Sequence, residues 1–140
     1  MNPKKIRPLY FGDGHESEKD FIAYEKIIND RRSVYSVSMA YVQNKNDLEL
    51  FLKRTKKLKN HHKATHHSWA VRIENEGVVY ESKNDGGETG AGQVILRILQ
   101  KRNMINAAVC MTRWYGGIKL EGDRFKHIQD ATIYVLDNKA

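Results

Sequence analysis

The chain has 140 residues and a formal net charge of +7, and hydrophobic residues make up 40% of it. This length fits one core, and without a bilayer-spanning apolar run or an opening signal peptide we expect a cytoplasmic domain with no membrane partner. The single cysteine, Cys110, lies in an apolar run. We therefore expect a buried thiol and no disulfide framework within the chain.

The first part of the chain predicts an extension, a strand and a helix. Residues 1–29 are expected to form an N-terminal extension that is partly packed, and residues 30–140 the main domain. The β-branched and aromatic run 34–42 predicts a strand. Asn46 and Glu49 then fit a capping box, which predicts a helix over 46–60 with one apolar face.

The excess positive charge lies on and after this helix. Between Glu49 and Glu74 there are seven basic residues and no acidic ones. The whole chain has 24 basic and 17 acidic residues, so outside this segment the 17 remaining basic residues equal the acidic ones in number. Such a patch is typical of a protein that binds a phosphate backbone, although lysines at a helix end also complement the helix dipole. The candidate nucleic-acid patch consists of Lys53, Arg54, Lys56, Lys57, Lys59 and Lys63.

Alternating apolar residues over 65–73 predict the next strand, with Trp69 and Val71 on one side and His66 and Ser68 on the other. His66 and His67 then face opposite sides of the sheet. With no second cysteine available, the histidines at 61, 62, 66 and 67 are not expected to bind a metal. A turn at 75–77 leads to a partner strand over 78–81.

The glycine-rich loop over 85–92 runs into a predicted helix. A helix N-terminus can bind an anion, but the lysine of a P-loop is absent, and Asp85 and Glu88 would repel a phosphate. Tight turning and a close approach of helix to sheet also explain the glycines, with Thr89 as the N-cap.

The apolar run that starts at Ala107 predicts a buried strand ending at Trp114, followed by a Gly-Gly turn and a helix that Asp123 caps. Arginine, tryptophan and tyrosine are enriched at binding hot spots, although large aromatic residues also pack cores. We expect one exposed partner-binding surface where the strand end meets this helix. It comprises Arg113, Trp114, Tyr115, Gly116, Gly117, Arg124, Lys126 and His127.

The predicted order of elements is β-α-β-β-α-β-α. It favours an α+β two-layer sandwich, with a four-stranded mixed sheet and helices on one face.

Four blocks of the sequence resemble the IMPACT family, whose bacterial branch includes the YigZ proteins. They are the Asp-Arg-Arg-Ser motif at 30–33, an Ala-Thr-His block over 64–73, the acidic glycine loop and the segment 113–128. Trp114 and the segment 123–128 resemble the eukaryotic branch. Departures from the family pattern are His67, Gly86 and Val94. The family-motif positions are Thr65, His66, Arg72, Asp85, Glu88 and Thr89.

The resemblance implies a fold like domain two of ribosomal protein S-five and domain IV of the ribosomal translocase. It also implies a function: inhibition of the amino-acid-starvation kinase of an initiation factor, by competition for the kinase's ribosome-associated activator, and contact with actin. Eukaryotic relatives carry an RWD domain and bacterial ones a second C-terminal domain, and we expect neither within 140 residues.

Two other hypotheses come from different classes. One is a ribosome- or RNA-binding module that acts through the basic helix. The other is a small enzyme that uses the glycine loop, but the spacing of Asp85, Glu88, His66 and His127 fixes no nucleophile, base and orienting group together. We therefore expect a non-enzyme without cofactors.

Overall fold

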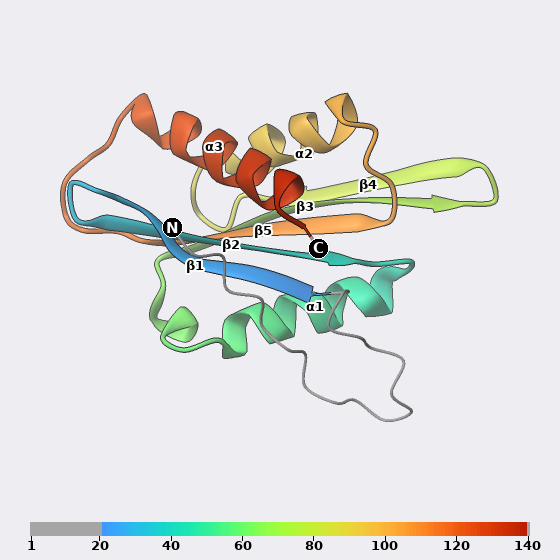
Figure 1. Ribbon diagram of the computed structural model, residues 1–140, viewed down its shortest axis with the longest axis horizontal. Helices are drawn as coiled ribbons and strands as arrows, with labels where there is room; N and C mark the ends of the chain where they lie inside the picture. Colours follow the sequence, from blue (N-terminus) through green and yellow to red (C-terminus); the bar gives the residue numbers. More distant parts are fainter. Residues whose placement is uncertain (1–20, 140) are drawn as a thin grey trace.

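The computed structural model describes residues 21–139, which form a single five-stranded sheet with helices packed on it (Figure 1). The strands lie in the order β1-β2-β5-β3-β4, and every neighbouring pair is antiparallel. In chain order the elements are β1 (Phe21–Asp30), β2 (Ser33–Tyr41), α1 (Lys45–Lys57), the 3-10 helix η2 (His61–Lys63), β3 (His66–Asn75), β4 (Val78–Asn84), α2 (Ala91–Lys101), β5 (Ala107–Trp114) and α3 (Asp123–Asp137).

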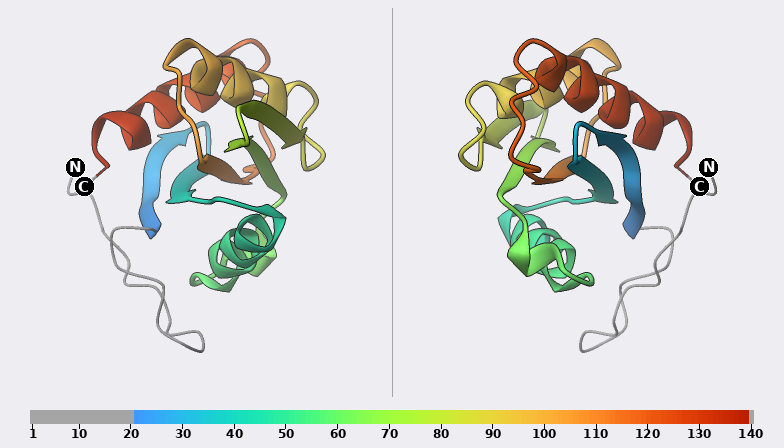
Figure 2. Two further views of the ribbon diagram at one scale, coloured as in Figure 1. Left: turned by 90° about the vertical axis from the view of Figure 1, so that its right-hand side faces the viewer. Right: turned by 90° about the vertical axis from the view of Figure 1, so that its left-hand side faces the viewer.

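The sheet is covered on both faces. Helices α2 and α3 lie on one side and α1 on the other, as the end-on views of Figure 2 show. Accordingly there are two core clusters, one with Ile95 and Val135 and the other with Phe51 and Val71. The α+β class is confirmed. The sheet differs from the predicted one, because it has five strands, is wholly antiparallel and carries helices on both faces.

Strand β1 accounts for the additional strand. Phe21–Asp30 pairs with β2, so part of the expected N-terminal extension belongs to the sheet, and residues 1–20 lie outside the described residues. The pairing is irregular between Tyr24 and Ile28, where Lys26 has φ of 55° and its backbone N–H donates to Ser36 Oγ at 2.9 Å. This bulge breaks the period of two that would have identified the strand.

Helix α1 begins one residue before the predicted start and ends at Lys57. Asn44 is its N-cap, because the Asn44 side chain accepts a hydrogen bond from the Asp47 backbone N–H at 2.8 Å. The inclusion of Arg54 in the candidate nucleic-acid patch, which requires an exposed side chain, was wrong. Arg54 is buried, and its guanidinium carbon lies 5.6 Å from the centre of the Phe21 ring.

Three further findings concern helix length, metal ligands and the cysteine. Within residues 21–139, no helix is long and apolar enough to cross a membrane, and no three histidine, cysteine or acidic side chains group as metal ligands. Cys110 is buried in β5, as expected, and this burial raises the pKa of its thiol to about 12.

Candidate partner-binding site

A buried ion pair lies at the end of the central strand. Arg113 of β5 donates through Nη1 to the carboxylate of Glu88, which comes from the loop before α2, and the two side chains are only 4% and 1% exposed. Arg113 Nη2 also donates to Ser33 Oγ at 3.2 Å, and the same oxygen accepts from the Gly116 backbone N–H at 3.2 Å. The pair thus joins the beginning of β2, the end of β5 and the glycine loop.

Two tyrosines flank the guanidinium group of Arg113. Its central carbon lies 5.4 Å from the ring centres of both Tyr35 and Tyr115, within the range of cation–π contacts. Arg113 Nε and the Tyr35 hydroxyl are buried, and neither has a hydrogen-bond partner among residues 21–139. Burial raises the pKa of Tyr35 to about 12, so its hydroxyl remains protonated at neutral pH. A buried donor without a partner costs about 1–3 kcal/mol.

Above this ion pair lies a hollow of about 400 Å³, here named the motif pocket. It opens between the end of β5, the glycine loop and the first turn of α3. Tyr115 at its edge is 43% exposed, and His66 on its wall uses Nδ1 to donate to the Gly86 carbonyl at 3.1 Å. The lining residues are His66, Gly87, Glu88, Arg113, Tyr115, Lys119, Leu120, Glu121 and Arg124.

The glycine loop has a structural role. The carboxylate of Asp85 accepts hydrogen bonds from the backbone N–H groups of Gly90 and Gly92, at 3.0 and 2.9 Å. These bonds lower the pKa of Asp85, and they occupy amides that a bound anion would need. The helix N-cap is Gly90, so the expectation that Thr89 caps α2 was wrong. A Cβ on Gly86 would lie 2.0 Å from the His67 carbonyl oxygen, which explains why a glycine is needed there.

Trp114 lies on the opposite face of the sheet from the motif pocket. Its Nε1 donates to the Asn60 carbonyl at 3.1 Å, and its ring packs edge-on against His61 with ring centres 4.9 Å apart. The expected single exposed surface is therefore wrong in two respects, since Arg113 is buried and Trp114 points away. Neighbouring residues of a strand project to opposite faces, so Arg113 and Trp114 cannot share one.

The other residues of the expected surface are divided. Arg124 lines the motif pocket, whereas Lys126 pairs with Asp130 and His127 with Asp30, each at 2.8 Å, and neither lines that pocket. Gly116 and Gly117 allow the backbone to turn beside the motif pocket. A Cβ on Gly116 would lie 2.2 Å from the Arg32 backbone, and Gly117 has φ of 88°.

The family-motif positions are also divided. His66 and Glu88 line the pocket, and Thr65 lies beside it, where its hydroxyl accepts from the Tyr115 backbone N–H at 3.0 Å. Arg72 lies elsewhere on β3, because it pairs with Glu81 at 2.9 Å and donates to the Met104 carbonyl. Sequence reasoning missed Tyr35, Lys119 and Glu121. Of these, Lys119 directly follows the Gly-Gly-Ile segment and could have been included.

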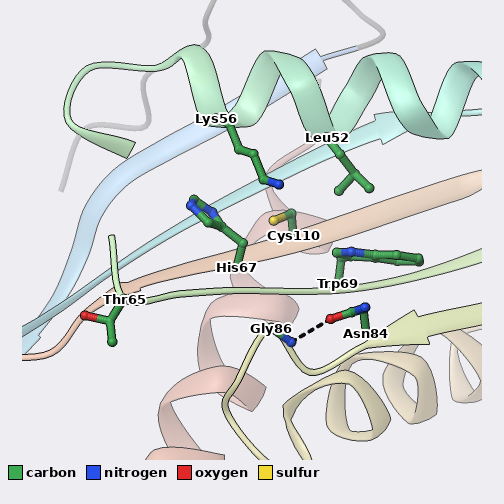
Figure 3. Close-up of a pocket in the computed structure, with 8 residues that line it drawn as sticks. All are labelled: Leu52, Lys56, Thr65, His67, Trp69, Asn84, Gly86 and Cys110. Atoms are coloured by element: carbon green, nitrogen blue, oxygen red, sulfur yellow. Dashed lines mark hydrogen bonds between the residues drawn. The ribbon is translucent and has the colours of Figure 1, made fainter. Parts of the chain in front are cut away.

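A second, smaller pocket of about 260 Å³ lies on the other face, between α1 and β3 (Figure 3). The close-up shows Lys56 extending from α1 toward His67 and Cys110, with Trp69 and Asn84 beside them. His67 Nε2 donates to the His61 carbonyl at 3.0 Å, and burial lowers the pKa of His67. Since His66 lines the motif pocket and His67 this one, the prediction that they face opposite sides is confirmed.

Comparison with known proteins agrees with these motifs. The family model described as the Impact N-terminal domain matches residues 31–136. Protein IMPACT of Mus musculus is 34% identical over 143 residues, which cover 99% of this chain and 45% of the relative. Protein IMPACT-B of Xenopus tropicalis is 35% identical over 123 residues, with 86% and 39% covered. The chain thus spans less than half the length of these relatives.

Two solved structures resemble the fold. A crystal structure described only as a hypothetical protein aligns with a TM-score of 0.74 at 20% identity, covering 86% of this chain and 61% of that one. The structure of the two-domain translational regulator Yih1 aligns with a TM-score of 0.58 at 28% identity, covering 97% and 54%. The first shows a shared fold, and the second adds a relative whose role is in translation.

Proposed function

The chain belongs to the family of the Impact N-terminal domain, and we propose that it is a non-enzymatic regulator of translation in the cytoplasm. In this proposal it occupies the ribosome-associated activator of the amino-acid-starvation kinase, and so lowers phosphorylation of the initiation factor. The observation that carries the proposal is the motif pocket, which brings His66 and Glu88 of the family motifs together with Tyr115 and Arg124 of the expected partner-binding surface. Contact with actin is a further proposal from the same resemblance.

The geometry of the pocket supports binding over catalysis. Arg113 and Glu88 neutralise each other in the interior, and Asp85 is engaged with backbone amides. Outside this pocket, the thiol of Cys110 is buried, with a pKa of about 12, so it stays protonated. By contrast, Tyr115 and Arg124 lie at the mouth, where an arginine and an exposed tyrosine suit a protein interface.

The proposed function can be tested in starved cells that express the chain. Wild-type protein is expected to lower phosphorylation of the initiation factor and to capture the activator at physiological salt. Tyr115→Ala combined with Arg124→Ala removes two candidate hot-spot residues, each worth about 2 kcal/mol, and so should abolish both effects. The control is Tyr80→Ala with Arg97→Ala, which removes the same residue types at exposed positions outside the pocket. Wild-type expression without either effect would refute the proposal.

The alternative function is weak binding of single-stranded RNA, favoured by the lysines on the outer face of α1. Lys53, Lys56 and Lys57 are exposed, and Lys56 also lines the pocket that contains Trp69, a ring on which a base could stack. Charge reversal at these three lysines should flatten the dependence of binding on salt, by about 0.7 in log–log slope for each phosphate that the variant no longer neutralises. Unchanged RNA affinity in the triple variant would refute this alternative.

A further inference from the structure

One side chain that lines the motif pocket has a donor that the surrounding side chains leave unused. Arg113 lines the pocket and is only 4% exposed. Its Nε–H group has no hydrogen-bond partner among the described residues. The hydroxyl of Tyr35, on the side chain packed against that guanidinium, is fully buried and also lacks a partner within residues 21–139. Tyr35 does not line the pocket, so the donor that an acceptor in the pocket would satisfy is that of Arg113.

The charges around the pocket indicate what kind of acceptor fits. Its lining contains three cations, from Arg113, Lys119 and Arg124, and two carboxylates, from Glu88 and Glu121. Glu88 is already neutralised by Arg113. The excess of one positive charge matches a single carboxylate, whereas a phosphate group with about two negative charges would be repelled by Glu121 at the rim.

The surroundings indicate that this carboxylate belongs to a protein. Three large hydrophobic side chains near the mouth are exposed, those of Tyr115, Ile118 and Phe125, and the Phe125 ring lies close to Gly90 of the glycine loop. If an acidic residue of a partner protein enters the pocket, the residues next to it in the partner's chain will contact these side chains. Contacts that surround a binding hot spot and exclude water from it strengthen a polar contact at its centre.

We infer that the motif pocket is the receptor for one acidic side chain of the protein partner, whose carboxylate is held by Arg113 and Arg124. This inference rests on the proposed function, because it takes the occupant to be part of a partner protein. The glutamate or aspartate enters past Tyr115, and Lys119 and Arg124 attract it electrostatically before contact.

The experiment uses the purified chain and a minimal probe, acetylglutamate amide, whose side-chain carboxylate is its only charge. Binding is followed in ¹H–¹⁵N NMR spectra through the Nε–H signal of Arg113 and the backbone signals of Gly87 and Glu121. We expect saturable shifts with an affinity in the millimolar range, as befits a probe of few atoms. Acetylglutamine amide, with the same shape and no charge, is expected to leave these signals in place.

Two variants locate the binding without disturbing the buried ion pair. Lys119→Gln removes one exposed cation of the pocket lining and should weaken probe binding about threefold. Arg124→Gln removes a cation at the mouth and should weaken it about threefold. Arg97→Gln removes the same charge from the exposed side of α2, and should leave the affinity unchanged.

Three results would overturn the inference. They are the absence of saturable shifts with acetylglutamate amide, equal weakening by Arg97→Gln and Arg124→Gln, and a saturable response to inorganic phosphate but not to the glutamate probe. The test is separate from that of the proposed function. If the probe binds but the activator is not captured, the pocket assignment stands and the partner is wrong; if the activator is captured but the probe does not bind, only this inference fails.

Discussion

Replacing Glu88 by glutamine tests the energetic role of the buried ion pair. The two side chains are 4% and 1% exposed, so Glu88→Gln leaves the charge of Arg113 in the interior without its counterion. Removal of one partner from such a pair costs about 3–5 kcal/mol. Glutamine keeps the volume and one acceptor oxygen, so we expect the lower end of this range, about 3 kcal/mol.

Urea denaturation monitored by circular dichroism measures this loss. With a slope of about 2 kcal/mol per molar urea, a loss of about 3 kcal/mol lowers the midpoint by about 1.5 M. Glu121→Gln is the matched control, because Glu121 is an exposed carboxylate of the same pocket and its loss should change stability by less than about 0.5 kcal/mol.

A double replacement separates the charge from the shape. Glu88→Leu with Arg113→Met removes both charges, and should be more stable than Glu88→Gln alone because no uncompensated charge remains. If Glu88→Gln costs no more than its exposed control, the carboxylate does not compensate Arg113, and the reasoning about the motif pocket is wrong.

Three further predictions concern the glycine loop, the first turn of the sheet and the central strand. Gly86→Ala should destabilise the domain by more than about 2 kcal/mol, because its Cβ would lie 2.0 Å from the His67 carbonyl oxygen, whereas Gly77→Ala, with open space at φ of 80°, should cost only about 1 kcal/mol in thermal unfolding. The pKa of Asp30 is lowered to about 2 by hydrogen bonds from Arg31 and His127. Its contribution to stability is therefore complete above its unfolded value of 3.8 and is lost as the pH falls toward 2, so Asp30→Asn should make acid unfolding less steep over this interval. The buried thiol of Cys110 should react with a maleimide only as fast as the domain opens, and labelling of the folded protein within seconds would contradict its burial.

Local sequence patterns predicted a strand well where the same pattern of apolar residues continued along the whole strand. The bounds of β5 coincide with the prediction, because its apolar run begins after a polar segment and ends at the Gly-Gly turn. The alternation in β3 correctly put Trp69 and Val71 on one side of the strand; both lie in the cluster with Phe51 of α1, and Ala70 between them lies in the other cluster. These positions depend on neighbouring residues alone, which a sequence displays directly.

The features that were missed depend on residues far apart in the chain. Burial of Arg113 requires Glu88 and Ser33, which lie 25 and 80 residues away. The position of α1 could have been inferred, since an unbroken apolar run such as 107–111 is typical of a strand covered on both faces. Nothing local distinguished Arg54 from the neighbouring lysines, because it is the packing of its guanidinium on Phe21 that buries it.

The strand order has a consequence for how the domain folds. The centre of the sheet is β5, the last strand in the chain, and it separates β1 and β2 from β3 and β4. The two hairpins can each form early from local contacts, but they share no hydrogen-bonded edge until β5 inserts between them. During synthesis the edges of β2 and β3 that will receive β5 therefore stay open until residue 114 has left the ribosome, and open strand edges promote aggregation. Insertion of β5 requires contacts over long sequence separations, so it should set the folding rate.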